Sequence, residues 1–262
     1  MVIFISELRR GRKGFLIWSA AISFMLVICV LMFPEMKGEM ESVTDMFANM
    51  GGFTQAFGMD RLNFGTLIGF YGIECGNILG IGGGFYAAYL GISMLAKEEH
   101  EHTAEFLLTH PVRRIDIMLQ KALAVAAQLI SLNLIILLLS VVSVLAIGED
   151  LPIKELLLLH GAYLILQLEI ALICFGVSAF LRRGSIGIGL GLAAVLYFLN
   201  ILCNISENAA FLKYITPFAY AEPADILENL SLNTGLILLG CVYAAVAVGV
   251  GVFEYTRKDI AA

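Results

Sequence analysis

The chain has 262 residues, of which 60% are hydrophobic and only 15% are charged. Soluble domains usually contain about 25% charged residues and no more than about 50% apolar ones, so this composition excludes an ordinary water-soluble globule. The net charge of −6 carries little information by itself, because most acidic residues lie between the apolar runs. We expect the lipid bilayer to be the surrounding medium, and we expect no nucleic-acid partner.

Long apolar runs define the predicted fold. A hydrocarbon core of about 30 Å requires about 20 predominantly apolar residues in a helix. Six stretches meet this requirement, so we predict an all-α polytopic membrane protein in which residues 1–262 form a single transmembrane domain. The predicted spans are Phe15–Phe33, Leu67–Leu95, Ala122–Ile147, Leu156–Leu181, Ile186–Cys203 and Gly235–Phe253.

The connections differ in character along the chain. Val2–Lys13 mixes apolar and basic residues and reads as an interfacial amphipathic helix that leads into the first span. Pro34–Thr66 is long and mixed, which favours a short amphipathic helix at the outer surface. Asn204–Thr234 places Pro217 and Pro223 among apolar residues. Because proline interrupts helices, this segment is predicted to be a broken or re-entrant helix.

The distribution of basic residues predicts the orientation. Lysine and arginine accumulate in the cytoplasmic connections of membrane proteins. With the N-terminus inside, the inner segments hold 12 of the 16 basic residues. We therefore expect both termini to be cytoplasmic. The four basic residues assigned to the outer segments are Lys37, Arg61, Lys154 and Lys213.

Motifs of enzymatic chemistry are missing from the sequence. It contains no G-x-x-x-x-G-K-[ST], H-E-x-x-H or G-x-S-x-G pattern, so we expect no catalytic residue and no nucleotide held by this chain. The spacing of His100, His102 and His110 matches no metal-ligand pattern, so we expect no metal site. Four glycines inside the second apolar run are expected to allow close helix approach. They are Gly80, Gly82, Gly83 and Gly84.

The cytoplasmic connection Lys97–Lys121 is the most informative segment. Ala104, Leu107 and Leu108 recur at helical spacing with later apolar residues, which places them on one helical face. Acidic residues crowd the start of this helix, and Pro111 ends or kinks it. The pattern fits a solvated acidic helix on the membrane surface, and it equally fits a docking element for a soluble partner.

Three sets of residues carry a family resemblance. The connection reads Glu98-Glu99 … Thr103-Ala104-Glu105-Phe106-Leu107-Leu108 … Pro111-Val112-Arg113-Arg114 … Lys121, and it is accompanied by Thr216-Pro217-Phe218-Ala219-Tyr220 with Pro223-Ala224-Asp225-Ile226-Leu227 and by Phe253 … Arg257-Lys258-Asp259-Ile260. Together with the layout of six spans, these segments resemble type-two ABC transporter permeases. Where the family usually has glycine before the threonine of the first motif, this chain has His102.

This resemblance implies a transport subunit without its own motor. Two permease copies, identical or closely related, would form the substrate pathway, and two separate ATP-binding subunits would bind ATP and Mg²⁺ and drive it. The connection after the second span would be an amphipathic coupling helix seated on the ATPase. The ATPase-coupling residues would be Glu98, Glu99, Glu101, Thr103, Glu105, Leu107, Leu108, Pro111, Arg113 and Arg114.

The candidates for the translocation path are three polar residues within the spans: Glu169, Asn133 and Asn200. Glu169 lies near the middle of the fourth span, where a charged carboxylate costs at least about 2.5–3.5 kcal/mol unless it faces protein or water. It is either functional or a hydrogen-bonded carboxyl between helices, with Asn133 or Asn200 as its partner.

The sequence therefore favours the permease subunit of an ATP-driven exporter in the plasma membrane. Two alternatives remain. An ion-coupled secondary transporter would use Glu169 and would normally show inverted repeats, which the sequence lacks. A peptide-sensing or immunity membrane protein would use the long outer segment for binding and would need no ATP.

Overall fold

The computed structural model describes residues 2–48, 51–100, 113–181 and 185–258, with only the backbone described for residues 39–48 and 96–100. Within these ranges the chain is helical, and six helical stretches are long and apolar enough to cross a membrane. This confirms the predicted all-α, six-span fold. The long helices are α1 (Val2–Ala48), α3 (Leu67–Cys75) continued by η1 (Gly76–Gly82) and α4 (Gly83–His100), α6 (Arg114–Ala146), α7 (Ile153–Ser178), α8 (Ile186–Ile205) and α10 (Thr234–Arg257).

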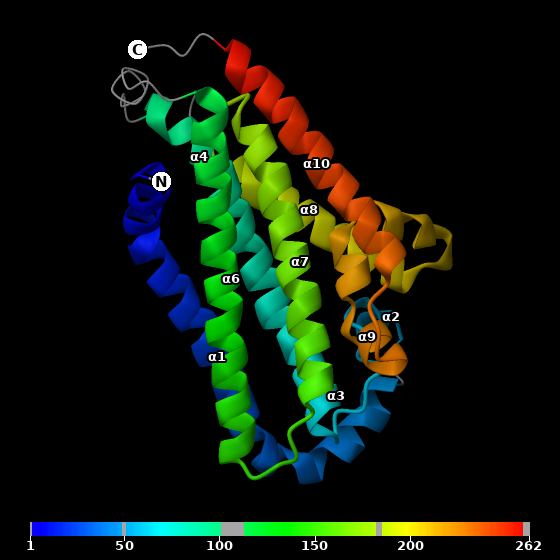
Figure 1. Ribbon diagram of the computed structural model, residues 1–262. Helices are drawn as coiled ribbons and strands as arrows, with labels where there is room; N and C mark the ends of the chain where they lie inside the picture. Colours follow the sequence, from blue (N-terminus) through cyan, green and yellow to red (C-terminus); the bar gives the residue numbers. More distant parts are fainter. Residues whose placement is uncertain (1, 49–50, 101–112, 182–184, 259–262) are drawn as a thin grey trace.

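The long helices form one bundle, and the start of α1 and the end of α10 lie toward the same end of it (Figure 1). We call this the termini end; it comprises the starts of α1 and α6 and the ends of α4, α7 and α10. The turn between α6 and α7 lies at the opposite end (Figure 1). Such an arrangement is what an even number of spans requires.

The first helix is much longer than the predicted span. Residues Val2–Lys13, the predicted span and the first part of the outer segment form one helix through Ala48. Pro34 lies inside it and cannot donate to the carbonyl of Val30, which explains a bend. Figure 1 shows the later part of α1 turning across the end of the bundle. In the outer segment a separate helix, α2, spans only Gly52–Ala56.

Short helices replace a simple loop between α8 and α10, as predicted. Residues 206–233, here called the broken segment, contain η2 (Glu207–Tyr214), η3 (Pro217–Ala221) and α9 (Pro223–Asn229). Pro217 and Pro223 each occupy the first turn of a short helix, where the missing proline N–H is tolerated. The two prolines therefore divide the segment into separate helices.

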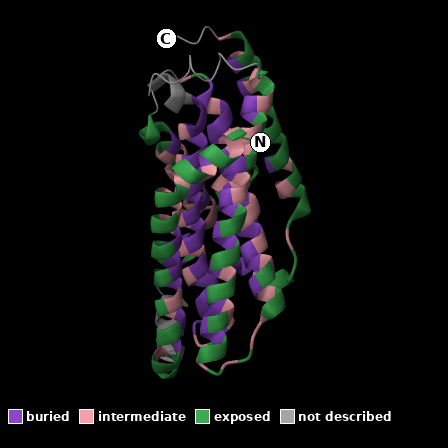
Figure 2. Ribbon diagram, turned by 60° about the vertical axis from the view of Figure 1, so that its left-hand side comes forward, coloured by how far each residue is buried: buried purple, intermediate pink, exposed green. Residues whose placement is uncertain are grey.

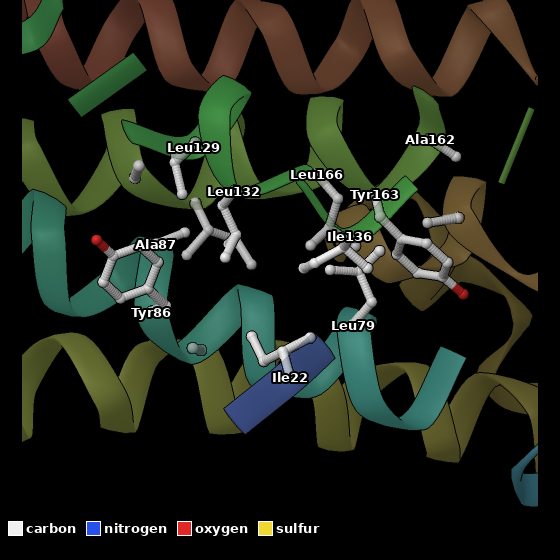
Figure 3. Packing of buried hydrophobic residues seen from close by; sticks show 14 of the residues in the cluster. Ile22, Leu79, Tyr86, Ala87, Leu129, Leu132, Ile136, Ala162, Tyr163 and Leu166 are labelled. Carbon is white, nitrogen blue, oxygen red and sulfur yellow. The ribbon is translucent and has the colours of Figure 1, made fainter. Parts of the chain in front are cut away.

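The second span lies at the centre of the bundle. In its most apolar window 67% of the residues are buried, against 17% for α10, so α10 presents most of its apolar side chains outward, as expected toward lipid or another protein. Figure 2 shows that the buried residues lie on the sides of the long helices that face the interior of the bundle, and that the exposed residues lie on the outside. The core joins α1, η1, α4, α6 and α7, and Figure 3 shows side chains from each of them pointing toward one another.

Glycine explains how the second span approaches α7. A methyl group added to Gly80 would lie 3.0 Å from the Tyr163 ring, and one on Gly83 would overlap the Gln167 amide. The predicted role in close helix approach is confirmed for Gly80 and Gly83, whereas a methyl group on Gly82 or Gly84 would make only ordinary contacts. The middle of the span is a π-helix, Gly76–Gly82, a feature that often accompanies functional sites and that the apolar pattern did not predict.

Candidate functional site

The predicted coupling element lies between α4 and α6. Glu98 and Glu99 fall on the last turn of α4, and Arg113 and Arg114 stand at the start of α6. The remaining predicted coupling residues lie outside the described residues: Glu101, Thr103, Glu105, Leu107, Leu108 and Pro111. The coupling role of this element stays a prediction.

The two neighbouring arginines have different environments. The Arg113 side chain is 84% exposed and forms an ion pair with Asp116 at 2.9 Å. The Arg114 guanidinium instead donates to the carbonyl oxygens of Tyr255, at 2.9 Å, and Lys258, at 2.7 Å. A cation bound to the last carbonyls of a helix is favoured by the helix dipole. Arg114 thus fastens the end of α10 to the start of α6.

Lys121 is a buried charge at the same end of the bundle. Its Nζ donates to Glu7 Oε1 at 3.0 Å and to the Met94 carbonyl at 2.7 Å, and its side chain is completely buried. From the sequence, Lys121 was interpreted as a basic residue of the cytoplasmic connection. In the structure its side chain joins α1, α4 and α6. Charges buried in this way are stable only when they are paired and hydrogen-bonded.

Asn133 belongs to a polar chain inside the bundle. Its amide nitrogen donates to Gln167 Oε1 at 2.7 Å and to the Leu129 carbonyl at 2.9 Å. Gln167 Nε2 in turn donates to the Leu79 carbonyl at 3.3 Å. Leu79 lies in the π-helix η1, so the chain connects α6 and α7 to the irregular part of the second span.

Glu169 faces protein, as its position in the span requires. It is 5% exposed and its Oε2 accepts a hydrogen bond of 2.8 Å from the hydroxyl of Tyr220. The predicted partners Asn133 and Asn200 are therefore wrong, because Asn133 turns toward Gln167 and Asn200 toward the broken segment. A methyl group on Gly240 would overlap the Glu169 carboxylate, so glycine makes room for this group beside α10.

Asn200 binds a carboxylate that the sequence analysis did not select. Its amide nitrogen lies 3.2 Å from Glu222 Oε2, and the Asn204 amide nitrogen lies 3.1 Å from the same oxygen. Burial raises the pKa of Glu222, while the two amide hydrogen bonds act in the opposite direction. Thus Glu169 and Asn200 both contact the broken segment, Glu169 through Tyr220 and Asn200 through Glu222. Asn133 instead belongs to a separate hydrogen-bond network with Gln167.

The residues missed by sequence reasoning are the partners: Tyr220, Glu222 and Gln167. A usable signal existed only for Glu222, which is an acidic residue immediately before Pro223 in an otherwise apolar stretch. Pairing across sequence separations of 51 residues, as between Glu169 and Tyr220, has no local signature.

The fold and these buried groups define a polytopic α-helical membrane protein whose polar side chains point into the bundle. Among the described residues, no group of three or more histidine, cysteine, aspartate or glutamate side chains could hold a metal ion. Comparison with protein families then gives a specific result: the model of the family described as ABC-2 family transporter protein matches residues 1–260.

The chain belongs to this family. It is accordingly a multi-pass membrane protein and the membrane component of a transporter. Membership of this family implies association with ABC ATP-binding subunits. No curated protein matches the chain.

Proposed function

We propose that the chain is the membrane-spanning permease subunit of an ATP-driven exporter in the plasma membrane, acting as one transmembrane domain. Two permease copies form the substrate pathway, and two separate ATPase subunits bind ATP and Mg²⁺ and hydrolyse the nucleotide. Both termini and the connection between α4 and α6 face the cytoplasm. The observation that carries this proposal is the family match over residues 1–260.

The structure supports a mechanical link from the coupling element to the bundle. In the sequence, the element lies between α4 and the 33-residue helix α6. Lys121 joins the starts of α1 and α6 to the end of α4 through a buried ion pair and a carbonyl contact. A displacement of the element would therefore move three spans together, because a buried pair of this kind resists separation.

ATP-dependent transport by the reconstituted permease and ATPase tests the coupling role. Glu105→Lys and Leu108→Asp are expected to leave membrane insertion and basal ATP hydrolysis intact while abolishing transport. The matched control is Asp150→Lys, a charge reversal at an exposed residue in the turn at the opposite end of the bundle. Normal transport by both variants would contradict the assignment of the docking surface.

The translocation path is proposed to pass beside the broken segment, where Glu169 and Asn200 meet their partners. Glu169→Gln retains an oxygen that can accept the Tyr220 hydroxyl, so the fold should persist while the charge is removed. Export by this variant should fall with unchanged amounts of folded protein. Unchanged export would remove Glu169 from the pathway.

A further inference from the structure

A polar pocket opens beside the broken segment. Its volume is about 450 Å³, within the range of about 300–1,000 Å³ that is typical of small-molecule sites. The ends of α8 and η2, the helices η3 and α9, the start of α10 and Arg61 form its walls. The polar side chains that matter for recognition are Arg61, Asn204, Lys213, Glu222 and Asp225.

The charges around the pocket favour a cation. Arg61 is already paired with Asp225 at 2.7 Å and with Glu228 at 2.5 Å. Lys213 and Glu222 complete the charged side chains that line the pocket. With Glu228, which pairs with Arg61 from outside this lining, the region holds three carboxylates and two cations. When Glu222 is ionised the site therefore has an excess of one negative charge, which attracts a positively charged ligand.

Glu222 presents one carboxylate oxygen for a new contact. Both amide hydrogen bonds, from Asn200 and Asn204, go to Oε2. None of the described side chains or backbone groups donates to Oε1. Because a carboxylate oxygen can accept more than one hydrogen bond, Oε1 is available to a donor.

Asn200 adds a second acceptor beside it. Its nitrogen must face the Glu222 carboxylate, which directs the amide oxygen Oδ1 away; this oxygen is buried and has no partner among the described residues. Glu222 and Asn200 both line a second, small cavity of about 30 Å³ next to Tyr163 and Tyr197, and Glu222 is the lining residue that this cavity shares with the pocket. This is room for about one water-sized group, and an unpaired buried acceptor is unfavourable until a donor reaches it.

We propose that the pocket binds a small organic molecule through a protonated primary amine, whose ammonium group donates to Glu222 and Asn200 in the small cavity while its body occupies the larger pocket. A primary ammonium fits the small cavity, and its three N–H donors can reach the two neighbouring acceptors. A quaternary ammonium has the same charge but no N–H, so it cannot satisfy Asn200. Binding at this site does not depend on the proposed coupling to an ATPase.

Binding should weaken in acid. The charged form of Glu222 is the one that attracts the ammonium, and burial raises the pKa of this carboxyl. As the pH falls through that raised pKa, the carboxylate is protonated and affinity is lost, although the amine itself stays charged. The titratable groups that face Glu222 are Arg61, Tyr163, Tyr197, Cys203 and Asp225.

Calorimetric titration of the purified full chain in detergent, without any ATPase, tests the site. The probe is phenethylamine, and the matched probes are its N-trimethyl derivative and phenethyl alcohol. We expect at least about tenfold weaker binding of both matched probes, because one charged hydrogen-bonded contact changes affinity by about this factor or more. Equal binding of the trimethyl derivative would overturn the proposal.

Variants separate contact from overall charge. Glu222→Gln should weaken phenethylamine binding at least about tenfold, whereas Glu228→Gln removes the same charge from outside the pocket and should change it by less than about threefold. Asn200→Val should also weaken phenethylamine binding. This variant gives an independent test of the site if Glu222→Gln alters folding. Equal losses in the two glutamate variants, or no loss in Asn200→Val, would contradict the proposed contacts. Because no ATPase is present, either result leaves the exporter function to be judged separately.

Discussion

The termini end of the bundle and the broken segment treat buried polar groups in opposite ways. At the termini end, Lys121 donates hydrogen bonds to Glu7 and to the Met94 carbonyl. Arg114 donates to the last carbonyls of α10. At the broken segment, Glu222 retains an oxygen for another donor and Asn200 Oδ1 is unpaired within the described structure. Complete pairing gives rigidity, as force transmission requires, while incomplete pairing beside a cavity is suited to a ligand.

The largest effect is expected from the buried ion pair. Lys121→Met removes the buried cation that Glu7 contacts at 3.0 Å, which should lower the free energy of unfolding by about 3–5 kcal/mol. The double variant Glu7→Leu/Lys121→Met should recover most of this loss, because a well-packed apolar pair often replaces a buried ion pair. Denaturant titration in mixed micelles measures both. A double variant as unstable as the single one would show that the pair does not act as a unit.

A smaller effect separates the two neighbouring arginines. Arg114→Met removes charged donors from the carbonyls at the end of α10 and should cost about 1.5 kcal/mol. Arg113→Met is the matched control, since its exposed side chain contacts only Asp116 among the described partners, and its stability should equal that of the parent. Hydrogen exchange should show faster opening of the last turn of α10 in Arg114→Met alone. Equal effects of the two substitutions would remove the capping role.

The smallest effect is expected at the ion pairs of the pocket wall. Arg61→Gln breaks two pairs whose side chains are 43–67% exposed, and exposed pairs contribute only about 0.2–1 kcal/mol. Thermal unfolding in detergent should therefore shift far less than in Lys121→Met. A loss as large as that of Lys121→Met would mean that the pocket wall is as tightly built as the termini end, and the contrast between the two regions would fail.

Much of the fold follows from local sequence, and most of the site does not. Apolar runs long enough for the bilayer define the six spans, and Pro217 and Pro223 mark where the broken segment divides. Burial of Lys121 was not predictable, because its partner Glu7 is 114 residues away and only tertiary packing joins them. Glu169 was recognised as a residue that must face protein, yet its partner came from the broken segment, whose path no local pattern specifies.

The proposed transport cycle requires a separate ATPase that docks on the connection between α4 and α6. Affinity purification of the tagged chain from membranes of its own host, with identification of the associated proteins by mass spectrometry, is the decisive experiment for this docking. We expect a P-loop ATPase to be recovered with the parent chain and with Asp150→Lys, and at least about tenfold less of it with Glu105→Lys. Equal recovery with all three chains, or recovery of no ATPase with the parent, would contradict it.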